Sequence, residues 1–373
     1  MLMEPMGSKA NPRQVIRFAC AYIAFMMGSG FATGQEILQY YAAYGRMGFL
    51  AVLVTCVLLT YVSVSFMTTG YRMHFDHGSR VFKHYCGAAV GGFFDCFTVL
   101  AIYLSVVVLL SGAGATLNQQ YGLNRAVGIL VMAALAAATV LLGFGRIVSI
   151  IGKIGPVIIA FVITIGLITA IQGIKGVARA DAAIANMNVL HASSNWLFSS
   201  FSYVGISIVW LAAFLSSLGA TAGSAREAKY GAVMGTLLFC SAVAIVTLAM
   251  VGNISEVNGA MVPMLVLAKK VSPALAQILT VIIYAGIYTA SVPLLWTASS
   301  RFTREGTAAN KITVLGLVVL AAVIALAVPF DKLMNVIYVL SGYIGFLLLG
   351  FMLVKNILDG RKRRQNRKKA NAD

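Results

Sequence analysis

A cluster of small and polar residues interrupts the first long apolar segment of the chain, within AFMMGSGFATGQEI. Gly28, Ser29 and Gly30 lie near its middle, and glycine destabilises a helix by up to about 1 kcal/mol relative to alanine. The cluster therefore favours a local unwinding that frees backbone groups, and freed N–H groups attract anions. We predict that Gly28, Ser29, Gly30 and Phe31 bind a substrate carboxylate through their backbone. Alternatively, Gly30 and Gly34 form a GxxxG face on which another helix packs.

A second cluster of this kind lies in a later apolar segment, NWLFSSFSYVGISIVWLAAF. Its small and polar residues crowd into nine positions: Ser199, Ser200, Ser202, Tyr203, Gly205 and Ser207. We predict a second unwinding between Ser202 and Gly205, with Ser202, Tyr203 and Gly205 forming the wall of a binding site opposite the first break. Neither break contains Arg or Asp, which favours a substrate without a strongly charged side chain.

Two charged residues within apolar segments are candidates for coupling, namely Lys153 and Glu36. Lys153 is about seven residues into the segment that contains SIIGKIGPVII. A charge within a bilayer costs on the order of 3 kcal/mol, so Lys153 is a candidate coupling residue, with snorkelling to the interface as the alternative. Glu36 is the acid nearest the first break. We predict that it serves as a proton site, an outer gate or a structural hydrogen-bond acceptor.

One face of the apolar segment 273–299 carries polar groups at helical spacing. Its members are Gln277, Thr280, Tyr284, Tyr288 and Ser291. We expect such a face to look into a helix bundle or a cavity. Tyr103, in the segment 90–116, is a further candidate for the substrate wall, and packing between helices is its alternative role.

These residues need a membrane domain to position them. Of 373 residues, 60% are hydrophobic and 10% are charged, whereas soluble domains are about a quarter charged. A membrane helix needs about 20 apolar residues. Ten segments of suitable length predict an all-α membrane protein: 14–43, 47–70, 90–116, 125–144, 146–173, 195–219, 230–252, 273–299, 311–328 and 333–356. Two loops are longer than turns, and we expect an amphipathic helix in 71–89 and a re-entrant or surface-lying helix in 253–272.

The basic residues indicate the orientation of the chain. With the N-terminus inside, 20 Lys and Arg residues fall in inner segments and seven in outer ones, and cytoplasmic segments are rich in these residues. Both termini are therefore predicted to be cytoplasmic. The net charge of +17 includes seven basic residues in the tail 357–373, which we expect to contact anionic lipid and not nucleic acid.

The sequence offers no arrangement typical of an enzyme or a metal site. The five cysteines form no CxxC pair, and the four histidines are not spaced with carboxylates as metal ligands are. Neither a nucleophile–base pair nor a phosphate-binding loop is recognisable. We therefore expect no catalytic activity, no metal and no cofactor other than a coupling ion.

The two clusters occupy matching places in two halves of the chain. About 144 residues separate Ser29 from the end of the fifth segment, and about 153 separate Tyr203 from the end of the tenth. Interrupted helices at matching positions are typical of inverted-repeat secondary transporters. Five crossings per half is an odd number, so the halves have opposite topology. We expect one transmembrane domain, with repeats at about 14–173 and 195–356.

The segment GSGFATGQEI, within residues 26–37, resembles the first-helix motif of the YkvI-type family of uncharacterised bacterial membrane proteins, and SFSYVGISI and GSAREAKYG resemble it more loosely. That family is grouped with the amino acid–polyamine–organocation transporters. The resemblance implies a LeuT-like five-plus-five fold with discontinuous first and sixth helices, in a bacterial cytoplasmic membrane. Lys153 resembles a lysine that replaces a sodium ion in proton-coupled relatives, and Thr289 and Ser291 stand where this fold supplies hydroxyls to a cation.

Together these observations predict a secondary active transporter of a small solute, an amino acid or related amine, that works by alternating access and is coupled to protons. Sodium-coupled symport is one alternative. A transporter-like receptor subunit that binds a small ligand without moving it is another.

Overall fold

The protein is helical throughout the part that the structure describes. The computed structural model describes residues 10–27, 29–142, 148–303 and 306–370, with side chains over the same ranges except at 29, 148–156, 360 and 362–370. Every regular element in these ranges is a helix, and none is a strand. The predicted all-α class is therefore confirmed.

The first predicted span is interrupted. It consists of α1 (Pro12–Met26), α2 (Ser29–Thr33) and α3 (Gln35–Tyr40), followed by a single 3-10 turn, η1 (Ala42–Tyr44). Met27 ends α1 with a non-helical backbone, and Gly34 separates α2 from α3 with a φ of 81°. Glycine adopts this left-handed conformation without strain. The predicted interruption of this span is confirmed, but Ser29 and Gly30, which we expected to be unwound, lie within α2, and Gly28 lies outside the described residues.

Nine further helices in the described ranges are long and apolar enough to cross a membrane. They are α4 (Met47–Met73), α5 (Arg80–Tyr121), α6 (Arg125–Leu142), α7 (Val148–Val177), α9 (Trp196–Ala220), α10 (Ala225–Gly252), α13 (Pro273–Ser300), α14 (Ala308–Ala327) and α15 (Phe330–Ala370). With the interrupted first span they make the ten predicted crossings. Three short helices lie in connections: α8 (Ala180–Ala185), α11 (Ile254–Val257) and α12 (Pro263–Val271).

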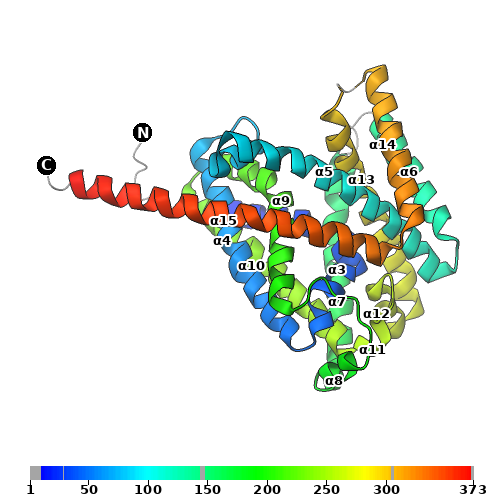
Figure 1. The fold of residues 1–373 in the computed structure, drawn as a ribbon. Helices are drawn as coiled ribbons and strands as arrows, with labels where there is room; N and C mark the ends of the chain where they lie inside the picture. The colour runs from blue at the N-terminus through cyan, green and yellow to red at the C-terminus, as the bar shows by residue number, and fades with distance from the viewer. Residues whose placement is uncertain (1–9, 28, 143–147, 304–305, 371–373) are drawn as a thin grey trace.

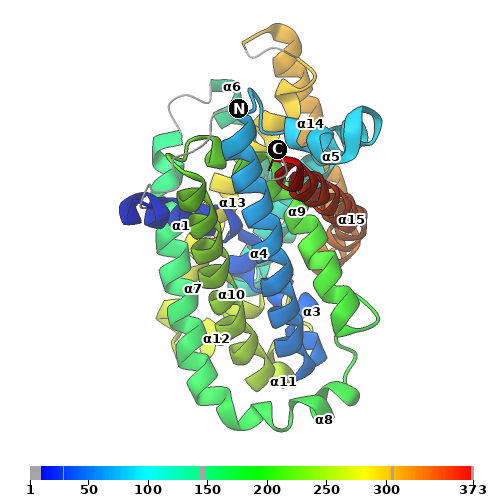
Figure 2. The ribbon, with the colours of Figure 1, turned by 90° about the vertical axis from the view of Figure 1, so that its left-hand side faces the viewer.

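The helices form one bundle. α9 packs between α4 and α15, and α10 packs against α1, α4 and α7. The connections that carry α8, α11 and α12 gather at one end of the molecule, and the beginning of α1 and the end of α15 lie away from that end (Figure 1 and Figure 2). α15 projects beyond the bundle as a long helix that carries the basic tail (Figure 1).

The sixth predicted span does not unwind. α9 is one continuous helix, so the predicted break at Ser202–Gly205 is wrong. The Ser202 hydroxyl donates to the carbonyl of Val339 in α15 at 3.1 Å, and other α9 serines donate to carbonyls one turn back. A Cβ atom on Gly205 would lie only 1.8 Å from the carbonyl oxygen of Gly342. The small residues of α9 thus permit close helix packing, which is a common use of such residues in membranes.

The two long loops contain short helices, as expected. In 71–89, the first turns of α5 begin at Arg80 and bend at Gly87, whose φ is 77°. In 253–272, α12 forms a helix of nine residues. α12 is not a surface helix, because most of its apolar side chains are buried against the bundle.

Candidate functional site

The short helix α2 lies at the centre of the bundle. It packs against α5, α7, α12 and α13 as well as α3. Phe31 is buried and its ring lies 6.2 Å from that of Phe239 in α10. The hydroxyl of Thr33 donates to the carbonyl of Gly30 at 2.8 Å. Side-chain hydrogen bonding therefore satisfies part of the backbone that the interruption of the helix leaves without partners.

A narrow cavity lies beside α2. It holds about 190 Å³ of empty space and is nowhere wide enough for a water molecule. Helices α2, α5, α13 and α15 line it, with Gly30, Thr33, Leu109, Ile287, Phe330 and Tyr338 among the lining residues. The bundle is thus closed around this point, and a solute can enter only if helices move apart.

Glu36, in the first turn of α3, folds back over the break. A Cβ atom on Gly30 would lie 1.8 Å from the Glu36 Oε1 atom, so any larger residue at this position would displace the carboxyl group from where it lies. Glu36 is 5% exposed, and its carboxyl group is hydrogen-bonded to the hydroxyl of Tyr203 in α9. None of the ion pairs among the described residues includes Glu36. The structure therefore brings three predicted site residues together, namely Gly30, Glu36 and Tyr203.

Aromatic rings enclose this carboxyl group. The Tyr203 ring meets the edges or faces of Tyr40 and Tyr41, with ring centroids 5.1 and 5.3 Å apart. The Tyr40 hydroxyl is buried and lies near the hydroxyl of Ser202, but it makes no hydrogen bond of good geometry to a described residue. One buried phenol therefore remains available to a ligand. Ser202 and Gly205 themselves belong to the contact between α9 and α15.

The polar face of α13 forms hydrogen bonds to one neighbouring helix and to its own backbone. Tyr284 and Tyr288 reach α6, where they hydrogen-bond to a backbone carbonyl at 3.0 Å and to Thr139 at 2.8 Å. Thr289 and Ser291 donate to carbonyl groups of their own helix at 3.0 and 3.3 Å. Much of the predicted face therefore serves packing between helices.

Three other predicted site residues are not brought to the cavity by described contacts. Lys153 lies near the beginning of α7, but its side chain is outside the described residues, as is that of Ser29. The Tyr103 hydroxyl donates to the carbonyl of Leu317 in α14 at 3.1 Å. The cavity wall instead includes Phe330 and Tyr338 of α15. Both are aromatic residues in an apolar context, and no feature of the sequence distinguished them from residues that only fill the core.

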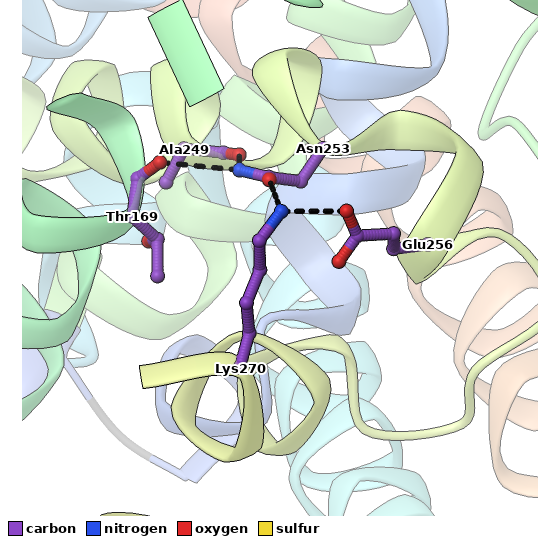
Figure 3. Close-up of polar contacts among 5 residues, drawn as sticks. All are labelled: Thr169, Ala249, Asn253, Glu256 and Lys270. Atoms are coloured by element: carbon purple, nitrogen blue, oxygen red, sulfur yellow. Dashed lines mark hydrogen bonds and ion pairs between the residues drawn. The ribbon is translucent and has the colours of Figure 1, made fainter. Parts of the chain in front are cut away.

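A set of polar contacts fixes α12 over the later part of the first span. The Lys270 ammonium donates to the side-chain oxygen of Asn253 at 2.6 Å and to Glu256 at 2.5 Å (Figure 3). Asn253 in turn donates to backbone carbonyls of Thr169 in α7 and Ala249 in α10, at 3.2 and 2.7 Å (Figure 3). This network ties α12 to two membrane helices.

The other end of α12 is fixed by an amide. The Gln119 side chain of α5 donates to the carbonyl of Val262 at 2.8 Å and accepts from its N–H group at 2.9 Å. Met264 of α12 lies directly on Gly34, where a Cβ atom would be 2.7 Å from it. α12 therefore covers the junction between α2 and α3.

In the described residues no group of three His, Cys, Asp or Glu side chains could hold a metal ion.

Comparisons with known proteins fit this architecture. No family model matches the chain. It is 23% identical over 348 residues to the uncharacterised membrane protein YkvI of Bacillus subtilis, which covers 93% of this chain and 97% of that protein. It is 24% identical over 351 residues to the uncharacterised protein YyaD of the same organism, with coverage of 93% and 98%.

Solved structures with the same fold are transporters. MhsT in complex with L-phenylalanine matches with a TM-score of 0.62 and 13% identity, over 92% of this chain and 89% of that chain. Mhp1 in its inward-facing conformation matches with a TM-score of 0.61 and 16% identity, over 95% of this chain and 81% of that chain. A manganese transporter of Eremococcus coleocola matches with 0.56 and 12% identity, over 95% and 81%. The protein therefore has the LeuT-like fold of secondary transporters.

Proposed function

We propose that this protein is a secondary active transporter of a small organic solute with an amino group, either an amino acid or a related amine. The observation that carries the proposal is the interrupted first span at the centre of the bundle, where Gly30, Glu36 and Tyr203 meet. An interrupted helix and a buried acid are costly within a membrane unless a ligand or ion uses them. The fold shared with MhsT, whose complex holds L-phenylalanine, supports the same class of solute and membership in the amino acid–polyamine–organocation superfamily.

The coupling ion in this proposal is the proton. Glu36 is buried and forms no described ion pair, and burial of an unpaired carboxylate favours its neutral, protonated form. Lys153 is the second candidate proton carrier, because a lysine in α7 can alternate between charged and neutral forms. Sodium is the alternative ion. The hydroxyl oxygens of Thr289 and Ser291 on α13, which packs against α2, retain lone pairs for a cation.

The same proposal includes the membrane context. We propose a bacterial cytoplasmic membrane, with both termini cytoplasmic and the basic tail on anionic lipid. The continuation of α15 as a helix to Ala370 supports an extended basic element beside the bilayer. Tail truncation after residue 358 is expected to reduce binding of the purified protein to anionic vesicles while leaving solute binding unchanged.

The test of function starts with the full chain in detergent. Its thermal stability is measured with individual amino acids and amines, with and without sodium. Compounds that stabilise the protein are then tested for counterflow in proteoliposomes, where a transporter exchanges labelled for unlabelled solute. Counterflow without sodium supports proton coupling, and counterflow only with sodium supports the alternative ion. Binding without counterflow would instead identify a receptor and contradict the proposal.

A further inference from the structure

The charge at the first break has one sign. The acid that lies against Gly30 is Glu36, whose Oε1 atom occupies the space that a Cβ atom on Gly30 would need. A substrate carboxylate bound to the backbone at Gly30, as the sequence suggested, would therefore meet the Glu36 carboxylate. Like charges at such short range repel strongly in a medium of low dielectric constant. An ammonium group at the same place would be attracted.

The groups that face Glu36 from neighbouring helices are phenols. Tyr40 of α3, Tyr203 of α9 and Tyr338 of α15 all interact electrostatically with it, as does Tyr41, which follows α3. On α10, the buried thiol of Cys240 interacts electrostatically with Tyr41 and Tyr203. None of these groups carries a positive charge, so none neutralises Glu36.

The described cationic groups on the elements that pack against α3 are directed elsewhere. Lys270 of α12 is paired with Glu256, while Lys269 of α12 and Lys332 of α15 are exposed. Asp331 of α15 has the same sign as Glu36. On α10, the charged residues Arg226, Glu227 and Lys229 lie in its first turns, at the end opposite Met250, which contacts Gly34. Tyr44 of η1 donates to the carbonyl of Ser193.

Lys153 belongs to a different level of the bundle. By the order of crossings, α7 begins on the side where α1 begins, and Lys153 is in its second turn. Glu36 lies beyond both interruptions of the first span, in α3. The counter-charge of Glu36 must therefore come from a proton or from a ligand.

We infer that the substrate is an organic cation, an amine or ammonium compound without a carboxylate, whose charged nitrogen lies against Glu36 within the tyrosines Tyr40, Tyr41, Tyr203 and Tyr338. A carboxylate together with aromatic faces is the usual recognition chemistry for ammonium groups. The unpartnered hydroxyl of Tyr40 supplies an oxygen that accepts a hydrogen bond from an N–H group. This inference rests on the proposed transport function and narrows its substrate class.

The mode of coupling follows from the single carboxylate. When the cation binds, the proton on the Glu36 carboxyl group leaves to water on the side from which the cation came. When a proton returns on the other side, the cation is released there. One proton therefore moves against each cation, and the coupled process is exchange and not symport.

The binding test uses chemical pairs that differ only by a carboxylate. Phenethylamine is compared with L-phenylalanine, putrescine with L-ornithine, and isoamylamine with L-leucine, each as a stabiliser of the full chain in detergent. We expect the amine of at least one pair to bind and its amino acid to bind about 10- to 100-fold more weakly. The affinity for that amine should fall by up to about tenfold per pH unit as the medium is acidified, because protons compete for Glu36.

Variants separate charge from shape. Glu36→Gln keeps the size of the side chain and should lose amine binding, while Glu36→Asp keeps the charge and should retain part of it. Asp76→Asn, at an exposed acid, is the matched control and should bind as the unmodified protein does. If Glu36→Gln does not fold, the pH dependence of binding to the unmodified protein still tests the same competition.

Transport is measured as uptake of the labelled amine into proteoliposomes, after subtraction of uptake into protein-free vesicles. Exchange predicts faster uptake when the vesicle interior is acidic. Faster uptake with an acidic exterior, or equal binding of the amine and its amino acid, overturns this inference but leaves the transport function intact. If counterflow is absent for every compound that binds, the proposed function itself fails.

Discussion

The substitution Gly205→Ala tests whether α9 is a continuous helix locked to α15. The added Cβ atom would lie 1.8 Å from the carbonyl oxygen of Gly342 and 2.6 Å from the backbone nitrogen of Phe346. Carbon–oxygen contacts normally stop at about 3.3 Å, so the two backbones must separate by more than about 1 Å. Overpacking of this kind costs about 1–3 kcal/mol, and the better helix propensity of alanine returns about 0.5–1 kcal/mol. We expect a net loss of about 1–2 kcal/mol.

The control is Gly350→Ala on α15. A Cβ atom there meets nothing within 4 Å, so this variant should be slightly more stable than the unmodified protein, by about 0.5–1 kcal/mol. Both variants are compared in one detergent by thermal unfolding, where about 1 kcal/mol shifts the midpoint by roughly 2–4 °C in domains of 150–250 residues. If Gly205→Ala is as stable as the control but inactive in counterflow, Gly205 faces the substrate and the packing argument is refuted.

Three further predictions concern positions outside the central site. The backbone N–H and guanidinium of Arg46 hold the pKa of Asp181 below its usual range. The resulting stabilisation is present at neutral pH and is lost as pH falls through the lowered pKa. Asp181→Asn should therefore lower the free energy of unfolding by less than about 1 kcal/mol and flatten the acid side of a stability–pH curve. Gln119→Ala leaves both backbone groups of Val262 without this partner, so peptides from α12 should exchange amide hydrogens faster, and an unchanged rate would show that α12 is held by other contacts. Tyr103→Phe should cost about 1 kcal/mol in thermal unfolding but leave uptake unchanged, whereas lost uptake at normal stability would return Tyr103 to the substrate wall.

The sequence predicted the membrane fold well because its signals are local. Apolar length determines each crossing, and nine of the ten predicted segments correspond to described helices long and apolar enough to cross a membrane, while the first segment is interrupted. The interruption of the first span was also predictable, since several weak helix formers precede Gly34, which ends α2 in a conformation that favours glycine. The predicted interruption of α9 is wrong, although Ser202 and Gly205 are also weak helix formers near the middle of a span.

The reason for that error lies in partners far away in the sequence. Val339 accepts the Ser202 hydrogen bond, and Gly342 presents its carbonyl to Gly205, and both belong to α15. Helix propensity cannot reveal whether a glycine faces a ligand or another backbone. The same limit hid Tyr338, which reaches the cavity only because α15 crosses the centre of the bundle.

The glycine contact between α9 and α15 makes the two repeats mechanically unequal. Gly345 also lies against the carbonyl of Gly205, so the sixth and tenth spans, α9 and α15, should move as one rigid unit. The first span, in contrast, has two joints, one on each side of α2. We therefore expect the first span to bend during transport while α9 stays fixed to α15. If both the first and the sixth span were interrupted, matching movements of the two would be expected instead. Disulfide cross-links between α9 and α15 should leave turnover intact, whereas cross-links between α1 and α10 should stop it.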